Sequence, residues 1–76
     1  MSDDLESVIS AQVGASVADA QVAVALEGNR ALIEVVSPVF ESMSRVDRQR
    51  TVYACIEEMI ADGRLHAVTI RATPPG

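Results

Sequence analysis

A switch in the spacing of apolar residues is the feature that most constrains the fold of this chain. From Ala20 to Leu26, valine or leucine occupies every second position, which is the pattern of a half-buried β-strand. Gly28-Asn29 follows, a pair that tolerates positive φ, and the β-branched run Ile33–Val36 comes next. The spacing therefore predicts an antiparallel hairpin.

A helix is predicted before this hairpin, and an irregular segment after it. Ser2 is positioned to cap the helix and Gly14 to end it. Its core-facing stripe is predicted to comprise Leu5, Val8, Ile9, Gln12 and Val13. Pro38 removes a backbone donor and so ends the second strand. Phe40, in the irregular segment, is expected to plug the end of the core.

The most strongly marked element is a second helix. It is predicted to start at Ser44, with Asp47 three residues later in a capping-box arrangement, and to end at Asp62-Gly63. Helical spacing places the following residues on its packing half: Val46, Gln49, Val52, Tyr53, Ile56, Met59 and Ile60.

A third strand is predicted over Ala67–Ala72, where Val68, Ile70 and Ala72 alternate inward. Because a long helix joins strands two and three, these strands can run parallel. We therefore predict an α+β fold of order α-β-β-α-β, with a three-stranded mixed sheet and both helices on one face. Residues 1–76 are expected to form a single domain, with residues 73–76 as a flexible tail.

The charge balance excludes some partners. Eleven acidic residues against six arginines give a net charge of −5, which repels polyanions. Neither nucleic acid nor an anionic membrane is favoured as a partner. The acidic N-terminal sequence lacks the pattern of a signal peptide, no apolar run reaches transmembrane length, and Cys55 is the single cysteine. A cytoplasmic location is expected.

Few residues suggest chemistry. His66 is the sole imidazole, expected at an exposed rim, where an ordinary surface histidine is the simpler interpretation. Cys55 is either a thiol activated by nearby positive charge or, as buried cysteines commonly are, a small core residue. Adjacent Glu57 and Glu58 point in different directions, so they make a poor carboxylate pair. Without a nucleophile elbow or a phosphate-binding loop, no enzyme is expected.

Three further segments bear on function through their sequence. Phe40–Val46 (FESMSRV), Thr51–Tyr53 (TVY) and Leu65–Pro74 (LHAVTIRATP) resemble the BolA family, especially its short acid-response branch. The resemblance implies the same α-β-β-α-β fold, which is similar to type II KH domains. It also implies an adaptor for a monothiol glutaredoxin that shares a bridging [2Fe-2S] cluster, in iron–sulfur or iron homeostasis or in stress response. His66 matches the family's cluster ligand, and no cofactor is expected on the isolated chain.

The hairpin loop departs from the family pattern. Many relatives place a cysteine or histidine there, whereas this loop reads Gly28-Asn29-Arg30-Ala31, and an arginine cannot ligate iron. Three alternatives follow: the partner's thiolates and glutathione complete the coordination, the cluster complex is labile, or glutaredoxin binds mainly without a cluster. Ser42 also replaces the family's usual glycine. Arg30, Arg64 and Arg71 are predicted to contact the partner.

Two other functions compete with this one. A KH-like transcriptional regulator that binds nucleic acid is disfavoured, because the sequence has no GxxG and its charge is acidic. A weak homodimer is the other possibility for a chain that is otherwise monomeric when alone. It would use the sheet face carrying Ala23, Ala25, Leu32 and Val36.

Overall fold

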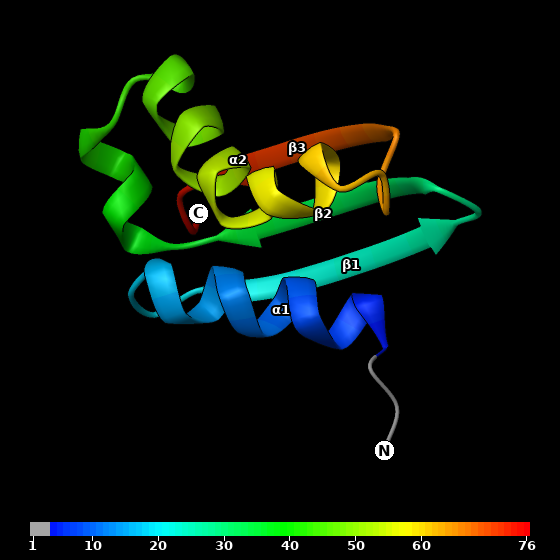
Figure 1. Ribbon diagram of the computed structural model, residues 1–76. Helices are drawn as coiled ribbons and strands as arrows, with labels where there is room; N and C mark the ends of the chain where they lie inside the picture. The colour runs from blue at the N-terminus through cyan, green and yellow to red at the C-terminus, as the bar shows by residue number, and fades with distance from the viewer. Residues whose placement is uncertain (1–3) are drawn as a thin grey trace.

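The computed structural model describes residues 4–76. Its elements follow the predicted order, with one short 3-10 helix added (Figure 1). In chain order they are α1 (Leu5–Ser16), β1 (Gln21–Glu27), β2 (Arg30–Val36), η1 (Pro38–Ser42), α2 (Arg45–Ala61) and β3 (Ala67–Thr73).

The strands form one mixed sheet in the order β1-β2-β3. β1 and β2 pair antiparallel, and β2 and β3 pair parallel, so η1 and α2 make the crossover between the two parallel strands. Both helices lie on the same side of this sheet, and its other side has no helix over it (Figure 1). The predicted fold class is confirmed.

A two-residue turn joins β1 to β2. Glu27 pairs with Arg30 across it, and Gly28 has φ 63°. Asn29 does not take a positive φ. Of the two residues predicted to tolerate that conformation, only Gly28 adopts it. Because the turn has only two residues, β2 begins at Arg30, three residues before the β-branched run Ile33–Val36 from which the strand was predicted.

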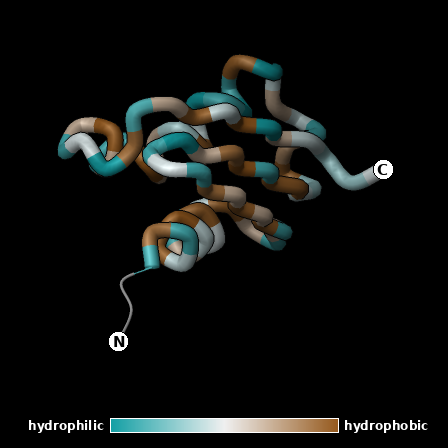
Figure 2. The backbone as a smooth tube through the Cα atoms, turned by 90° about the vertical axis from the view of Figure 1, so that its right-hand side faces the viewer, coloured by the Kyte–Doolittle hydropathy of each residue, from teal (hydrophilic) through white to brown (hydrophobic). Residues whose placement is uncertain are grey.

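The core lies between the helices and one face of the sheet. Along each strand, more buried residues alternate with more exposed ones, and Figure 2 shows hydrophobic residues recurring along the strands. Within residues 4–76 the buried apolar side chains are Ile9, Val13, Val17, Ala31, Ile33, Val35, Phe40, Val52, Ile56, Met59, Leu65 and Ala72.

The first helix differs from its prediction at both ends. Ser2 lies outside the described residues, and Asp4 is the N-cap, its carboxylate accepting from the Glu6 amide. The prediction that Gly14 ends the helix is wrong. The helix continues to Ser16 because the next apolar position, Val17, is buried against the core, and Gly14 takes no positive φ. Gln12, predicted on the packing stripe, is exposed.

The segment between β2 and α2 is a densely bonded corner. Pro38 begins η1, and Phe40 within it is fully buried, as predicted. Ser37 is also fully buried, and its hydroxyl donates to the Ala18 carbonyl at 2.6 Å. The Arg48 Nε donates to the carbonyls of Phe40 and Met43 at 2.8 and 3.2 Å. Those polar contacts close one end of the sheet.

The second helix starts as predicted, with the Ser44 hydroxyl accepting from the Asp47 amide at 3.1 Å. Its packing half is narrower than predicted. Val46 and Tyr53 are 58% and 43% exposed, and Gln49 is exposed too. Helical spacing placed these three residues on the packing half of the helix. Because β3 is the last strand of the sheet, no further strand covers them.

The last strand runs one residue past its predicted end. Thr73 belongs to β3, because its carbonyl accepts from the Ser37 amide at 3.1 Å, so only residues 74–76 follow the strand. In the part of the chain that the structure describes, neither helix is long and apolar enough to cross a membrane.

Candidate partner-binding site at the hairpin end

His66 lies at the end of the sheet where the β1–β2 turn meets the start of β3. The α2 helix stops at Asp62, Gly63 turns the chain with φ 85°, and the buried Leu65 anchors the loop in the core. His66 follows directly, and its amide donates to the Asn29 carbonyl at 2.9 Å. The backbone is thus fixed at a residue whose side chain is exposed.

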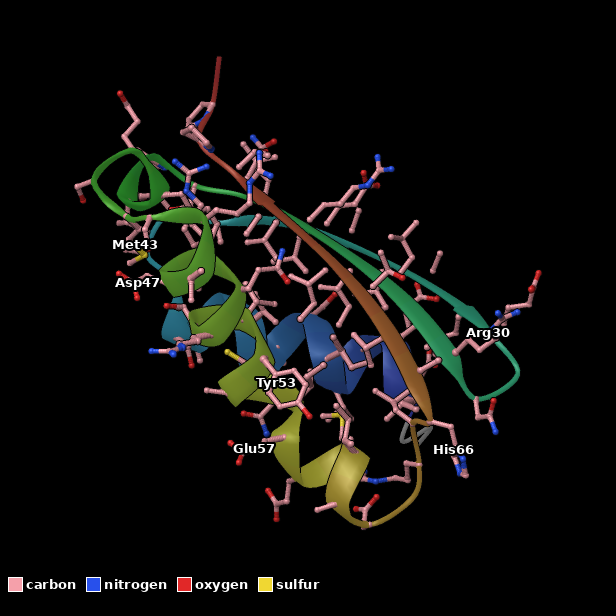
Figure 3. All side chains as sticks on the ribbon, turned by 90° about the horizontal axis from the view of Figure 1, so that it is seen from above. Arg30, Met43, Asp47, Tyr53, Glu57 and His66 are labelled. Atoms are coloured by element: carbon pink, nitrogen blue, oxygen red, sulfur yellow. The ribbon has the colours of Figure 1, made fainter. Side chains whose placement is uncertain are left out.

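The imidazole makes no hydrogen bond to any residue in 4–76 and points away from the body of the molecule (Figure 3). The predicted exposed rim position is confirmed. The ring faces solvent, and both of its nitrogens lack partners within the described chain. A ring nitrogen is therefore available to ligate a metal ion or to bond to a group on another molecule.

Arg30 projects from the same end of the sheet (Figure 3). It stands at the start of β2 in register with Ala67, the residue after His66, and forms no ion pair within residues 4–76. Beside it the open face has a shallow hollow of about 400 Å³. Its lining residues are Ala25, Leu26, Glu27, Arg30, Ala31, Leu32, Ala67, Val68 and Thr69.

The other two arginines predicted to contact a partner are held by acidic neighbours. Arg64 donates from Nε to Asp62 at 2.8 Å. This side-chain hydrogen bond holds the pKa of the Asp62 carboxyl below its ordinary value and raises the pKa of Arg64. Arg71 lies 3.9 Å from Glu34 on the open face, in a row of the sheet distant from His66. The structure therefore places His66 and Arg30 at the same end of the sheet, with Arg64 in the turn before His66.

The remaining candidates stay apart from this site. Cys55 is half-buried against the core, and its thiol donates to the Thr51 carbonyl at 3.3 Å. Arg48, an arginine on the same helix that could have supplied a positive charge near the thiol, instead donates to backbone carbonyls of the η1 corner. The geometry supports the interpretation of Cys55 as a small packing residue. Glu57 and Glu58 are both exposed on α2.

Of the cysteine and histidine side chains that ligate iron–sulfur clusters, the hairpin end offers His66. Among residues 4–76, no three His, Cys, Asp or Glu side chains gather closely enough to hold a metal ion. The turn itself offers glycine, asparagine and arginine, none of which replaces a thiolate. An imidazole does substitute for a thiolate on iron in Rieske centres. A [2Fe-2S] cluster at His66 would need its other ligands from a second molecule.

Comparison with known proteins now identifies the family. A family model for BolA-like proteins matches residues 20–76, from the last residue before β1 to the end of the chain. The chain belongs to the BolA family. This confirms the family to which the motifs from Phe40 to Pro74 pointed.

Relatives of this BolA-like chain show the same relationship. The acid stress protein IbaG of Escherichia coli strain K12 is 44% identical over 55 residues, which cover 72% of this chain and 66% of IbaG. BolA1 from Arabidopsis thaliana superposes with a TM-score of 0.83 at 23% identity, covering 97% and 95% of the two chains. Mouse BolA1 superposes with a TM-score of 0.77 at 26% identity, covering 97% of this chain and 68% of the other.

Sequence reasoning missed two features of this BolA-like structure. The hollow beside Arg30 forms only when the strands pair, so no pattern within a short segment of the sequence predicts it. Gln49 was assigned to the packing half, yet its side-chain amide donates to the Ile70 carbonyl on β3 at 2.8 Å. A polar residue within an otherwise apolar stripe was the available signal for that contact.

Proposed function

We propose that this chain is a non-enzymatic adaptor that docks on a monothiol glutaredoxin with its hairpin end and contributes His66 as one ligand to a shared [2Fe-2S] cluster. The observation that carries the proposal is an exposed imidazole on a backbone that the hydrogen bond from the His66 amide to the Asn29 carbonyl holds in place. Membership of the BolA family supports a glutaredoxin as the class of partner, and the exposure of His66 supports this residue as the cluster ligand.

The site suits docking better than catalysis. A general acid or base is normally oriented by a hydrogen-bonded partner, and the His66 ring has none within residues 4–76. Arg30 lies at the same end of the sheet, next to a shallow, open hollow lined largely by small and aliphatic side chains. Such a rim fits a protein surface with an acidic group opposite Arg30.

A [2Fe-2S] cluster has four ligand positions. His66 would supply one nitrogen, and the thiolates of glutaredoxin and of glutathione would fill two more, so the fourth position is left to another group from outside this chain. Because Arg30 stands where relatives place a second ligand, we expect a complex that loses its cluster more readily than one with two ligands from the adaptor. By analogy with the name of its acid stress relative IbaG, the adaptor would act in stress response, and the proposed cluster would connect it to iron homeostasis.

Co-expression with a monothiol glutaredoxin tests the proposal. We expect a coloured heterodimer whose visible absorption and circular dichroism bands shift in the His66→Ala variant. Glu41→Ala is the control, because Glu41 is exposed in η1, at the end of the sheet where β2 finishes. An unchanged spectrum in His66→Ala would exclude ligation by His66, and failure to recover any heterodimer would exclude the partner.

A further inference from the structure

The outer edge of β3 has backbone groups without strand partners. Glu27 and Arg30 flank the two-residue turn, so residues of β2 with even numbers bond to β1 and those with odd numbers bond to β3. In the parallel pairing, the amides and carbonyls of Ala67, Thr69, Arg71 and Thr73 then point toward β2. Those of Val68, Ile70 and Ala72 point outward, away from the sheet.

Gln49 independently supports this assignment. Its amide reaches over the edge to the Ile70 carbonyl at 2.8 Å, which is possible only if that carbonyl points outward. No other hydrogen bond to the outward groups occurs within residues 4–76. Unpaired strand edges of this kind are templates for another strand.

An apolar shelf lies above the same edge. Val46 and Tyr53, the large apolar side chains that are exposed within residues 4–76, are three residues before and four residues after Gln49. This spacing places all three on one stripe of α2, and that stripe faces β3 because Gln49 bonds to it. Figure 3 shows Tyr53 on this side of the helix. A fourth strand added to β3 would find its helical cover already present.

We propose that the strand added to β3 is β3 of a second copy of this chain, paired antiparallel about Ile70. In that register, Ile70 faces Ile70 of the other copy, and Val68 faces Ala72, so every outward group meets a partner. The same two-fold brings Val46 of one copy against Tyr53 of the other, since they lie on opposite sides of Gln49. The contact is self-complementary in both backbone and side chains.

The charge distribution favours this edge over the edge at β1. Residues 1–43, which include α1, β1 and β2, carry one arginine and seven acidic residues, a net charge of −6. Residues 44–76, which include α2 and β3, carry five arginines and four acidic residues, a net charge of +1. Two copies meeting through β3 therefore avoid the repulsion that two β1 edges would generate.

Gln49 acts as a guard on this edge. Its hydrogen bond occupies the Ile70 carbonyl that the central pair needs, so both copies must release Gln49 before they pair. This keeps association weak in the natural sequence. Capping an open edge in this way limits uncontrolled strand addition.

Sedimentation equilibrium of the full chain, from micromolar to millimolar concentration, tests the proposal. Gln49→Ala should tighten the dimer about tenfold, since two exposed hydrogen bonds no longer have to be broken. Gln12→Ala, which removes a glutamine exposed on α1, should leave the dissociation constant unchanged. If both the natural chain and Gln49→Ala stay monomeric at millimolar concentration, the proposal is wrong.

Val68→Pro separates this dimer from one through the open sheet face. The Val68 amide points outward, so proline removes a donor that β2 does not use, and the monomer should keep its fold as judged by circular dichroism. Dimerisation should be lost. Tyr53→Glu, at an exposed position, is a second variant expected to abolish the dimer by placing a charge in the shelf contact. A dimer that persists in both variants overturns the β3 interface.

Discussion

The two ends of the sheet are built differently. At the end where β2 finishes, buried Ser37 binds Ala18, Thr73 accepts from the Ser37 amide, and Arg48 binds two carbonyls of the η1 corner. At the hairpin end, a single carbonyl, that of Asn29, accepts from His66 and Ala67, and the side chains face solvent. The first end is held by buried and bonded groups, and the second leaves the His66 imidazole and the Arg30 guanidinium exposed, where the proposed partner would dock. The comparison predicts that substitutions at the first end change folding and those at the second change binding.

The largest effect is expected from Phe40→Ala at the closed end. Phe40 is fully buried, and removing such a side chain leaves a cavity that lowers the free energy of unfolding by about 3–5 kcal/mol. That is a large fraction of the total for a small domain. Urea denaturation followed by circular dichroism measures it. Tyr53→Ala, the other aromatic, should lower it by less than about 1 kcal/mol because its ring is exposed.

A smaller loss is expected from Ser37→Ala at the same end. The substitution leaves the Ala18 carbonyl and the Val39 amide without the buried hydroxyl that now serves both. We expect the free energy of unfolding to fall by about 1–3 kcal/mol. Ser7→Ala on the exposed side of α1 is the matched control and should change it little. Equal effects of the two substitutions would contradict the assignment of Ser37 to a structural role.

His66→Ala, at the hairpin end, should affect binding without affecting folding. Because the ring makes no contact that folding requires, the free energy of unfolding should change by no more than about 0.5 kcal/mol. The spectrum of the glutaredoxin complex should change nonetheless. Thermal unfolding of the isolated chain measures the first quantity. A large loss of stability would show that His66 belongs to the structural end instead.

The smallest effect concerns pH and Asp62. The hydrogen bond from Arg64 lowers the pKa of the Asp62 carboxyl in the folded chain. A lowered pKa stabilises the fold above the pKa of the unfolded state, and this contribution disappears as the pH falls through the folded value. Asp62→Asn should therefore lower the melting temperature slightly at neutral pH, with the difference shrinking as the pH falls below the ordinary pKa of an aspartate. Added salt should reduce it, since the pair is exposed.

The sequence by itself determined the two long helices, the three strands and their order, and it singled out His66 as a candidate ligand. Alternation every second residue, a Gly-Asn turn, Pro38 and the Ser44 cap each act over a few residues, so they predict local structure without a fold. Family motifs from Phe40 to Pro74 identified the imidazole. Local signals failed where a neighbour decided the outcome. Gly14 did not end α1, because burial of Val17 outweighs the helix propensity of one glycine.

Only the tertiary structure decided which apolar residues are covered. Helical periodicity assigns Val46 and Tyr53 to a packing face, but coverage depends on how far the sheet extends beneath the helix. Because β3 is the last strand, these side chains stay exposed and the Ile70 carbonyl is left to Gln49. The placement of His66, Arg30 and the hollow at one end of the sheet likewise exists only after β2 and β3 pair. Contacts between residues distant in sequence carry no local pattern, so folding alone creates them.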